Sequence, residues 1–389
     1  MAAFGTVTYG ELFGAEPVAV THPQTLDELA DTVRVAAESG YAVVPNGGGL
    51  GQDYGYPLRA GSFTLIQTSG LNRIVAVEPG DLTITVEAGA TLARVQAALL
   101  PHGLFLPLDP PNPERATVGG MLAVNAFGAS RLGYGTARDW CIGLSVVSAV
   151  GRVTKSGGKV VKNVTGYDLP KLHIGALGTL GVIAEATFKV APLPEATRTI
   201  IVTLTPRQNT APGAFIATVL DNTAPTQAYR RTDATGDYVV FVFRGFVEVV
   251  EQYAQAVCAA ATPLASRGAS VAVFSELLDT QDAEPSAFVL RLSGDLARDN
   301  ERHERIAASV PGTIVTYSGT GVSDLFSTQD TPAPGDGVTH RAVLHAPLAV
   351  RAALPVWTPE PASLPLMRRV KVALDPAGVF NTGRFVGRM

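Results

Sequence analysis

Three glycine-rich segments constrain the fold of this chain more than any other feature of its sequence. They occupy residues 46–51, 116–126 and 175–183. The first follows a predicted strand at residues 42–45, and the third leads into a predicted strand at residues 182–190. Glycine lets a backbone approach a ligand or another segment closely, and successive amides without side chains can surround an anion. The segments therefore predict either three tightly packed turns or a main-chain cradle for a large phosphate-containing ligand.

Two familiar phosphate-binding motifs do not account for the first segment. A Walker loop requires Gly-Lys followed by Ser or Thr, whereas Gln52 and Asp53 follow here. A dinucleotide-binding fingerprint opens a helix, whereas the turn-forming residues 54–57 come next. In the second segment, Thr117 and Asn125 could bind a ligand that lies against the main chain, but a tightly packed helix entry explains the glycines equally well. Both alternatives stay open at this point.

Hydrophobic periodicity predicts a mixed helix and strand domain that ends at Pro194. Thr25 and Glu28 form the capping box of a helix that Gly40 ends, and Thr91 can cap a second helix. The predicted strands of this domain are residues 42–45, 63–67, 74–77, 83–87, 144–150 and 182–190.

The rest of the chain alternates strands and helices in the order of a split β-α-β unit of the ferredoxin type. Dense prolines between residues 327 and 365 predict a long irregular crossing, followed by a last helix at 366–374. The predicted domains are residues 1–194 and 195–365, with a C-terminal segment at 366–389. The strands are predicted at 199–205, near 227, and at 238–243, 270–274, 287–292 and 313–317, and the helices at 213–220, 247–260 and 300–309.

Composition excludes several classes of function. The net charge is −4 and only 16% of residues are charged, so the sequence offers no basic surface for nucleic acid. Two cysteines cannot hold an iron–sulfur cluster or a four-cysteine zinc site, so redox chemistry would need an organic cofactor. His340 and His345 lie five apart on a predicted strand and point to opposite faces, so they are poor metal co-ligands. No apolar run reaches the length of a membrane span, which predicts a cytoplasmic chain.

The three glycine segments, in this order and at this spacing, resemble the PCMH-type (vanillyl-alcohol-oxidase-type) FAD-binding domain. The resemblance begins at residues 20–25, continues through 45–51 and is densest from 107 to 194, and residues 374–384 resemble the family's C-terminal return to the flavin. It implies an α+β fold with a two-lobed FAD-binding domain, a smaller ferredoxin-like cap domain and a C-terminal segment that packs on the first domain. It also implies non-covalent FAD, because residues 47–49 and 126–128 offer no His or Cys for a covalent link.

The resemblance also assigns the residues expected to bind FAD, while it leaves the catalytic residues unknown and assigns no metal. The sequence departs from the family at Leu50, where Thr or Ser is usual; the backbone nest is unaffected. The expected FAD-binding residues are Pro45, Asn46, Gly47, Gly48, Gly49, Leu50, Gly51, Pro107, Asp109, Thr117, Val118, Gly119, Gly120, Ala123, Asn125, Gly128, Tyr134, Gly135, Gly181, Ile183 and Asn381.

Within the family, residues 109–111, 125–128, 131, 134–139 and 161–168 look most like the FAD-binding E subunits of bacterial glycolate oxidases. That resemblance implies a complex with a larger catalytic flavoprotein subunit and an iron–sulfur subunit, which oxidises glycolate, a small 2-hydroxy acid, to glyoxylate.

The His-rich metal motif and catalytic His of stand-alone family members that oxidise 2-hydroxy acids do not occur in this sequence, so we expect that chemistry in a partner. Two alternatives stay open: a flavin-bearing assembly subunit without its own turnover, and a stand-alone FAD-dependent alcohol or 2-hydroxy-acid oxidoreductase that uses Tyr134, Lys371 or Arg384 at the flavin. A cytoplasmic location is expected, with association at the inner face of the membrane through the complex left open.

Overall fold

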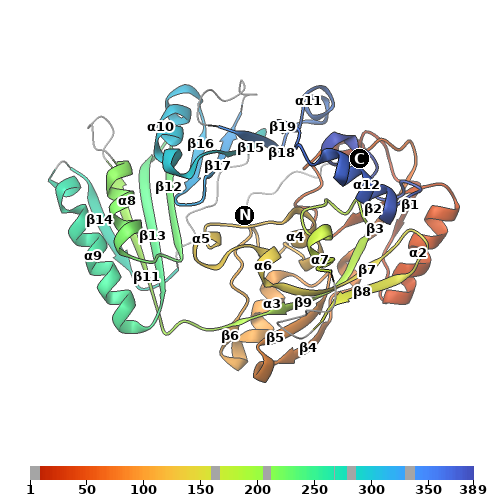
Figure 1. Ribbon diagram of the computed structural model, residues 1–389, viewed down its shortest axis with the longest axis horizontal. Coiled ribbons are helices and arrows are strands. Elements are labelled where there is room, and N and C mark those ends of the chain that lie inside the picture. The colour runs from red at the N-terminus through yellow and green to blue at the C-terminus, as the bar shows by residue number, and fades with distance from the viewer. Residues whose placement is uncertain (1–8, 159–166, 205–211, 267, 278–285, 329–337) are drawn as a thin grey trace. The chain divides into compact units, whose positions relative to one another are not determined.

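The computed structural model describes residues 9–158, 167–204, 212–266, 268–277, 286–328 and 338–389 (Figure 1). Helices and strands alternate along the chain, and the predicted α+β class is confirmed. The chain divides into two compact units, which are described separately below. We call them the glycine unit, whose described parts lie in Phe4–Phe127, Thr136–Leu193 and Pro347–Met389, and the sheet unit, whose described parts lie in Gly128–Gly135 and Pro194–Ala346.

The first lobe of the glycine unit is a small parallel sheet covered by one long helix. The sheet has the order β1 (Ala19–Thr21), β3 (Phe63–Gln67), β2 (Ala42–Asn46). Helix α2 (Leu26–Glu38) begins where the predicted capping box places it. The Thr25 hydroxyl accepts the Glu28 amide at 3.2 Å, while the Glu28 carboxylate accepts the Gln24 amide at 2.7 Å instead of that of Thr25. Its apolar face buries Leu29 and Val33 in one core with Val43 and Ile66. The lobe also contains α1 (Tyr9–Phe13) and η1 (Thr68–Gly70).

The second lobe of the glycine unit is built on a five-stranded antiparallel sheet. Its order is β4 (Ile74–Glu78), β5 (Thr83–Glu87), β9 (Val182–Lys189), β7 (Cys141–Val147), β8 (Val153–Gly157). Helices α3 (Leu92–Leu99) and α4 (Val118–Val124) bury apolar side chains in one core with β5 and β9. Shorter elements are η2 (Pro79–Asp81), η3 (Leu100–His102), β6 (Leu104–Phe105), α6 (Ala137–Trp140), α7 (Pro170–His173) and β10 (Ala191–Pro192).

The C-terminal part of the glycine unit contributes α11 (Leu348–Ala353), β19 (Trp357–Thr358), α12 (Leu364–Leu374) and η5 (Val386–Arg388). Residues 347–365 therefore belong with this unit, whereas the sequence predicted them in the cap domain. The Arg351 guanidinium attaches these residues to the glycine unit, since it donates to the backbone oxygens of Leu12 at 2.9 Å and of Gly55 at 3.3 Å.

The sheet unit contains the predicted ferredoxin-type unit and extends it. The unit consists of β11 (Ala196–Leu204), α8 (Pro212–Asn222), β12 (Gln227–Asp233), β13 (Gly236–Gly245), α9 (Val247–Ala265) and β14 (Ser270–Phe274). Its strand order, β14-β11-β13-β12, is that of a ferredoxin-type sheet. The same sheet continues through β16 (Thr313–Tyr317), β17 (Val322–Ser327), β15 (Phe288–Ser293) and β18 (His340–His345). Within the predicted irregular crossing after residue 327, the strand predicted at His340 and His345 is confirmed as β18, which pairs along β15.

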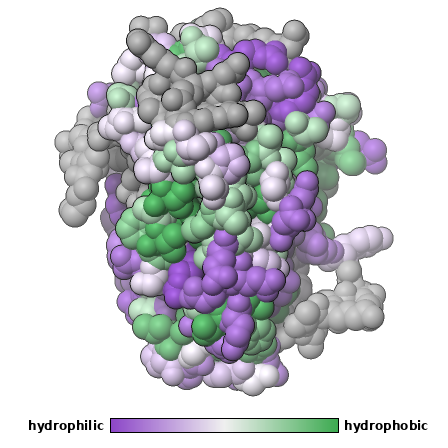
Figure 2. Space-filling view, turned by 90° about the vertical axis from the view of Figure 1, so that its left-hand side faces the viewer, coloured by the Kyte–Doolittle hydropathy of each residue, from purple (hydrophilic) through white to green (hydrophobic). Residues whose placement is uncertain are grey.

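Helices α8 and α9 cover one face of this sheet, where Phe215 and Val257 pack with Ile200 and Phe241. Helix α10 (Asp299–Ser309), preceded by η4 (Leu296–Arg298), lies against β16. Figure 2 shows the side of the molecule that is on the left in Figure 1, where apolar and hydrophilic side chains alternate on the surface. Among the described residues, no helix has the length and apolar character needed to cross a bilayer.

The short helix α5 (Arg131–Tyr134) belongs to the sheet unit although it lies early in the chain. The Gln227 side chain donates to the Ser130 hydroxyl at 2.8 Å, and the Gly133 amide donates to the Thr226 oxygen at 3.2 Å. Gly133 has to be small here, because an added Cβ would lie 2.8 Å from Thr226 Cα. These contacts attach residues 128–135 to the start of β12.

Candidate functional site

The first glycine segment presents backbone donors that the protein itself does not use. Among the described residues, no acceptor takes the amides of Gly48, Gly49, Leu50 or Gly51. Gly49 has φ +75°, a conformation that favours glycine. Successive free amides of this kind can bind an anion such as a phosphate group. The segment therefore has the chemistry of the anion cradle that the sequence left as one of two alternatives.

The first and second glycine segments are packed directly against each other. A Cβ added at Gly47 would lie 2.1 Å from Thr117 Oγ1, and one added at Gly48 would lie 1.8 Å from the Arg115 oxygen. The Arg115 guanidinium also donates to the Gly48 oxygen at 3.0 Å. Gly47 and Gly48 thus have a packing reason to be glycine that is independent of any ligand.

The amides of the second segment are used inside the protein. Thr117 caps α4 by accepting the Gly120 amide at 3.3 Å. The Val118 amide donates to the Ala90 oxygen at 2.9 Å, and the Gly119 amide donates to the Ala88 oxygen at 2.7 Å. These three backbone donors serve the helix entry, which was the second alternative for this segment.

Asn125 ends α4 and leaves a buried acceptor unpaired. Its φ of +49° is a left-handed conformation that Asn tolerates better than most residues. Its Oδ1 is buried and has no hydrogen-bond partner among the residues that the structure describes. The third glycine segment lies beside it, since a Cβ at Gly175 would meet Asn125 Cβ at 3.6 Å and the Leu177 amide donates to the Ala123 oxygen at 2.9 Å.

Asn381 repeats this arrangement from the C-terminal end of the chain. Its Nδ2 donates to the Leu177 oxygen at 2.7 Å, while its buried Oδ1 likewise lacks a partner within the described ranges. A Cβ at Gly178 would lie 3.2 Å from Asn381 Nδ2 and 3.6 Å from Pro45 Cγ. Pro45, at the start of the first glycine segment, the third segment at residues 177–178 and the C-terminal residue Asn381 therefore lie side by side.

These residues fit FAD. A diphosphate needs donors, and the amides of residues 48–51 are uncommitted. The flavin ring, the ribityl chain and the adenine carry N–H and O–H donors, and Asn125 Oδ1 and Asn381 Oδ1 are buried acceptors without partners in the described chain. An unpaired buried acceptor costs about 1–3 kcal/mol, so a ligand that supplies donors to these two oxygens would stabilise the chain.

The other predicted FAD residues fall into two groups. Pro107 and Asp109 follow β6. Gly181 directly precedes β9, and a Cβ there would lie 2.6 Å from Val146 Cγ1, while Ile183 lies in β9 and packs in the core. Gly128, Tyr134 and Gly135 belong to the sheet unit and are not brought together with the glycine segments inside one unit. In the family motif at 161–168, residues 161–166 lie outside the described residues.

Three polar groups considered for chemistry at the flavin have specific surroundings. Burial raises the pKa of Tyr134, and Arg244 partly offsets this. Lys371 Nζ donates to the Thr179 oxygen at 2.7 Å, to the Phe380 oxygen at 3.1 Å and to Asp375 at 2.5 Å. All three of its donor positions are thus used, so Lys371 is a structural cross-link and not a free base. The third group, Arg384, is treated below. No cluster of three His, Cys, Asp or Glu residues that could hold a metal is found in the described part of the chain.

Comparisons with known proteins agree with this site. Residues 17–157 match the family model described as "FAD binding domain". The chain is 36% identical to glycolate oxidase subunit GlcD of Bacillus subtilis (strain 168), over 48% of this chain and 39% of that protein. It is 42% identical to glycolate oxidase subunit GlcE of Escherichia coli (strain K12), over 32% of this chain and 35% of that protein. D-lactate dehydrogenase of Archaeoglobus fulgidus is 37% identical over 46% of this chain and 40% of its own length.

The matched region thus spans about two fifths of the length of these relatives. Among solved structures, a chitooligosaccharide oxidase superposes with a TM-score of 0.67 at 17% identity, covering 97% of this chain and 95% of its own. An alkyldihydroxyacetonephosphate synthase superposes with a TM-score of 0.64 at 16% identity, and the superposition covers 93% of this chain and 76% of that protein. These likenesses show the fold. The family match and the sequence relatives confirm the predicted resemblance and FAD as the cofactor.

Proposed function

We propose that this chain, an FAD-dependent oxidoreductase whose residues 17–157 are an FAD binding domain, is the flavin-binding subunit of an assembly that oxidises a 2-hydroxy acid. Glycolate, oxidised to glyoxylate, is the substrate that we propose. The observation that carries the proposal is the match to two different proteins that are both named as glycolate oxidase subunits, at 36% and 42% identity. D-lactate and D-2-hydroxyglutarate dehydrogenases among the relatives support the same class of substrate.

In the proposed site, the chain's own residues bind and orient the cofactor. The amides of residues 48–51 would hold the diphosphate, and Asn125 and Asn381 would accept hydrogen bonds from the flavin-bearing part. Bound FAD supplies the acceptor for the hydride that leaves the carbon bearing the substrate hydroxyl. We further propose that the residues which bind the hydroxy acid come from the partner flavoprotein subunit, and that an iron–sulfur subunit carries the electrons onward, since two cysteines cannot hold a cluster.

Purification of the full chain alone and with its co-encoded proteins tests the proposal. We expect the isolated chain to be yellow and to show little glycolate-dependent dye reduction, and we expect turnover when the partners are added. D-lactate and D-2-hydroxyglutarate serve as comparison substrates. In the complex, His340→Ala and His345→Ala should leave turnover largely intact. Steady glycolate oxidation by the pure chain, abolished by either histidine change, would contradict the proposal.

A second candidate is a stand-alone FAD-dependent 2-hydroxy-acid dehydrogenase. It is favoured by the 37% identity to a relative named simply D-lactate dehydrogenase. The same assay separates the two candidates, because a stand-alone enzyme turns over without partners. A chain that binds FAD and assembles, but whose flavin is never reduced by substrate in the complex, would instead be an assembly subunit.

A further inference from the structure

The geometry points to Arg384 as a positioning residue for the first glycine segment, acting through Gln52 on the amides proposed to hold the FAD diphosphate. The inference rests on the proposed FAD site and concerns how the C-terminal end of the chain shapes it. Arg384 and Gln52 are 332 residues apart in sequence. The sequence placed Arg384 at the flavin only in the stand-alone alternative, and it assigned Gln52 no role in binding FAD.

Gln52 closes the loop formed by the first glycine segment. Its Nε2 donates to the Pro45 oxygen at 2.8 Å and to Asn46 Oδ1 at 2.9 Å, so it joins the two ends of the loop. Its Oε1 accepts Arg384 Nη1 at 2.8 Å. A side-chain amide with both its donor and its acceptor engaged has one fixed orientation. The shape of the loop between Asn46 and Gln52 therefore depends on Arg384.

Arg384 is well placed for this role because it is buried and makes several contacts with one short stretch. The residue is only 2% exposed. Besides Gln52 Oε1, its guanidinium donates to the backbone oxygens of Gln52 and, at 3.0 Å, of Tyr54. The planar fork of arginine can reach three acceptors in one plane, which a lysine cannot do.

The backbone around Arg384 is locked to the same stretch. The Tyr56 amide donates to the Arg384 oxygen at 2.9 Å, and the Arg59 amide donates to the Thr382 oxygen at 2.9 Å. Gly55 has φ +100°, and a Cβ there would lie 2.4 Å from the Arg384 oxygen. The guanidinium thus has little freedom to move unless the C-terminal segment moves with it.

The charges nearby favour an anion at this loop. Burial, with a contribution from Arg351, lowers the pKa of Arg384 to about 9, and Asp53 opposes this. The guanidinium is still charged at neutral pH. Two buried arginines face one carboxylate, which leaves a surplus positive charge behind the loop. A diphosphate held on the loop amides would gain from that charge.

Trp357 provides a reporter for this region, because only one other tryptophan, Trp140, is present in the sequence. Its ring centroid lies 5.6 Å from each of the rings of Tyr54, Tyr56 and Phe385. In a Trp140→Phe background, tryptophan emission therefore reports on the surroundings of Trp357, which include Tyr54, Tyr56 and Phe385. ADP is the suitable probe, since it carries the diphosphate of FAD but does not absorb tryptophan emission.

The test uses the full-length chain freed of flavin and measures FAD affinity, ADP affinity and Trp357 emission. Arg384→Met should weaken FAD and ADP binding about tenfold or more and abolish the ADP-induced change in emission, since several hydrogen bonds from a charged group are lost. Arg384→Lys should bind with intermediate affinity, because charge is restored without the fork. The matched control is Arg388→Gln, an exposed arginine 4.2 Å from the Tyr56 ring centroid that should bind FAD within about twofold of wild type.

Unchanged FAD and ADP affinity in Arg384→Met, with only stability lowered, would overturn the inference and leave Arg384 as a structural residue. If that variant does not fold, Gln52→Ala removes the bridge while Arg384 keeps its bonds to the backbone oxygens of residues 52 and 54, and unchanged affinity there would overturn the inference equally. The proposed function fails separately, when wild type binds FAD but glycolate never reduces it in the complex. If Asn125→Gly and Gly49→Ala also leave FAD affinity unchanged, the glycine segments are not the FAD site and the inference falls with them.

Discussion

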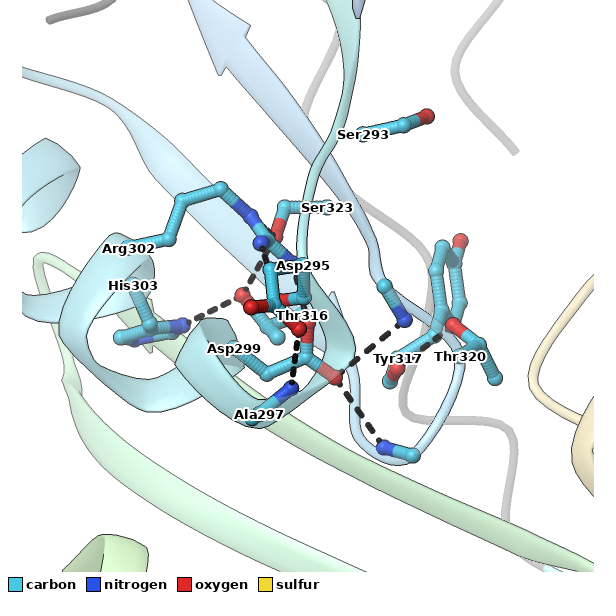
Figure 3. A network of polar contacts seen from close by, with 12 residues as sticks. Ser293, Asp295, Ala297, Asp299, Arg302, His303, Thr316, Tyr317, Thr320 and Ser323 are labelled. Carbon is cyan, nitrogen blue, oxygen red and sulfur yellow. Dashed lines mark hydrogen bonds and ion pairs between the residues drawn. The ribbon is translucent and has the colours of Figure 1, made fainter. Parts of the chain in front are cut away.

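Two polar regions of this molecule differ in how their hydrogen bonds are satisfied. In the sheet unit, a network around Asp299, Arg302 and His303 pairs its buried groups with one another (Figure 3). In the glycine unit, the amides of residues 48–51 and the oxygens of Asn125 and Asn381 have no partner in the described chain. A buried polar group that is satisfied internally stabilises one fold, whereas a group left unsatisfied indicates a ligand.

In the sheet-unit network of Figure 3, the buried side chains of Asp299, Arg302 and His303 each have hydrogen-bond partners within the protein. Asp299 forms an ion pair with Arg302, and its second oxygen accepts the amides of Gly319 at 3.2 Å and Gly321 at 3.3 Å. Arg302 also donates to Ser323 at 3.4 Å. Helix α10 is thereby fixed to the turn between β16 and β17.

His303 continues the network on the other side of α10. Its two ring nitrogens lie 2.8 Å from the Thr232 hydroxyl and 2.9 Å from the Thr316 hydroxyl. Thr316 in turn lies 2.8 Å from Ser323 Oγ. With both nitrogens occupied and the ring fully buried, His303 is a structural residue and not a free base.

The largest effect is expected from Gly48→Val in the glycine unit. The new side chain would collide with the Arg115 oxygen and disturb the amides of the loop, so FAD should be lost and the apo chain should unfold at lower denaturant. Flavin absorbance after gel filtration and a denaturant titration measure both. Gly61→Val is the control, because a Cβ at Gly61 meets nothing within 4 Å and FAD should stay bound. Full flavin occupancy in Gly48→Val would reduce the first segment to a turn.

The second-largest effect is expected in the sheet unit, where a substitution should lower stability without changing FAD affinity. Asp299→Ala leaves Arg302 buried without its carboxylate and should lower the free energy of unfolding by about 3–5 kcal/mol. FAD affinity should stay within about twofold, since the altered contacts all lie in the sheet unit. Glu301→Ala removes exposed ion pairs from the same helix and should cost less than about 1 kcal/mol. A loss of FAD binding in folded Asp299→Ala would show that the network serves the cofactor after all.

Sequence patterns predicted individual helices and strands well. They did not predict which glycine segment leaves its backbone amides free and which uses them inside the protein. The capping box located α2, and the predicted strand at 270–274 is β14 as observed. The first and second segments look similar as strings of small residues, yet only the amides of the first are free. That difference arises because residues 88–90 accept the amides of Val118 and Gly119, a pairing of distant segments that no local pattern encodes.

The same reason explains the other differences from expectation. Residues 128–135 belong to the sheet unit through contacts with Thr226 and Gln227, nearly 100 residues further along the chain. Arg384 reaches Gln52 across most of the sequence. Strand β18 is the strand predicted at His340 and His345, but its pairing with β15, about 50 residues earlier in the chain, is not visible in the local sequence. Propensity describes neighbours in sequence, and these features depend on neighbours in space.

Lowering the pH should lower the free energy of unfolding through one buried histidine in each unit. Burial lowers the pKa of His173 in the glycine unit to about 4, and burial with Arg230 and Arg302 lowers that of His303 well below its usual value. Each ring stays neutral in the folded chain but gains a proton in the unfolded chain below about pH 6.5, so the free energy of unfolding falls as pH falls.

For His173, the loss between pH 7.5 and pH 5 should be at most about 2 kcal/mol. Denaturant titrations at the two pH values measure it, and His173→Gln should show a correspondingly smaller difference. An unchanged pH dependence in His173→Gln would mean that its ring titrates in the folded chain as it does in the unfolded one.

The smallest effect tests the comparison most directly, because a satisfied and an unsatisfied group respond to deletion in opposite ways. Asn125 and Asn381 both have positive φ, so Asn→Gly removes the side chain while the backbone conformation stays favourable. In Asn125→Gly the unpaired Oδ1 disappears, and the apo chain should be as stable as wild type or slightly more so. FAD affinity should nevertheless fall about tenfold, because the acceptor that the cofactor would satisfy is gone.

Asn381→Gly should show the same fall in affinity but a lower apo stability, since its Nδ2 bond to the Leu177 oxygen is lost as well. Isothermal titration with FAD and denaturant unfolding of the apo protein give both quantities. A parallel loss of stability and affinity in Asn125→Gly would place that residue with the structural network of the sheet unit, and the distinction drawn from unpaired acceptors would fail.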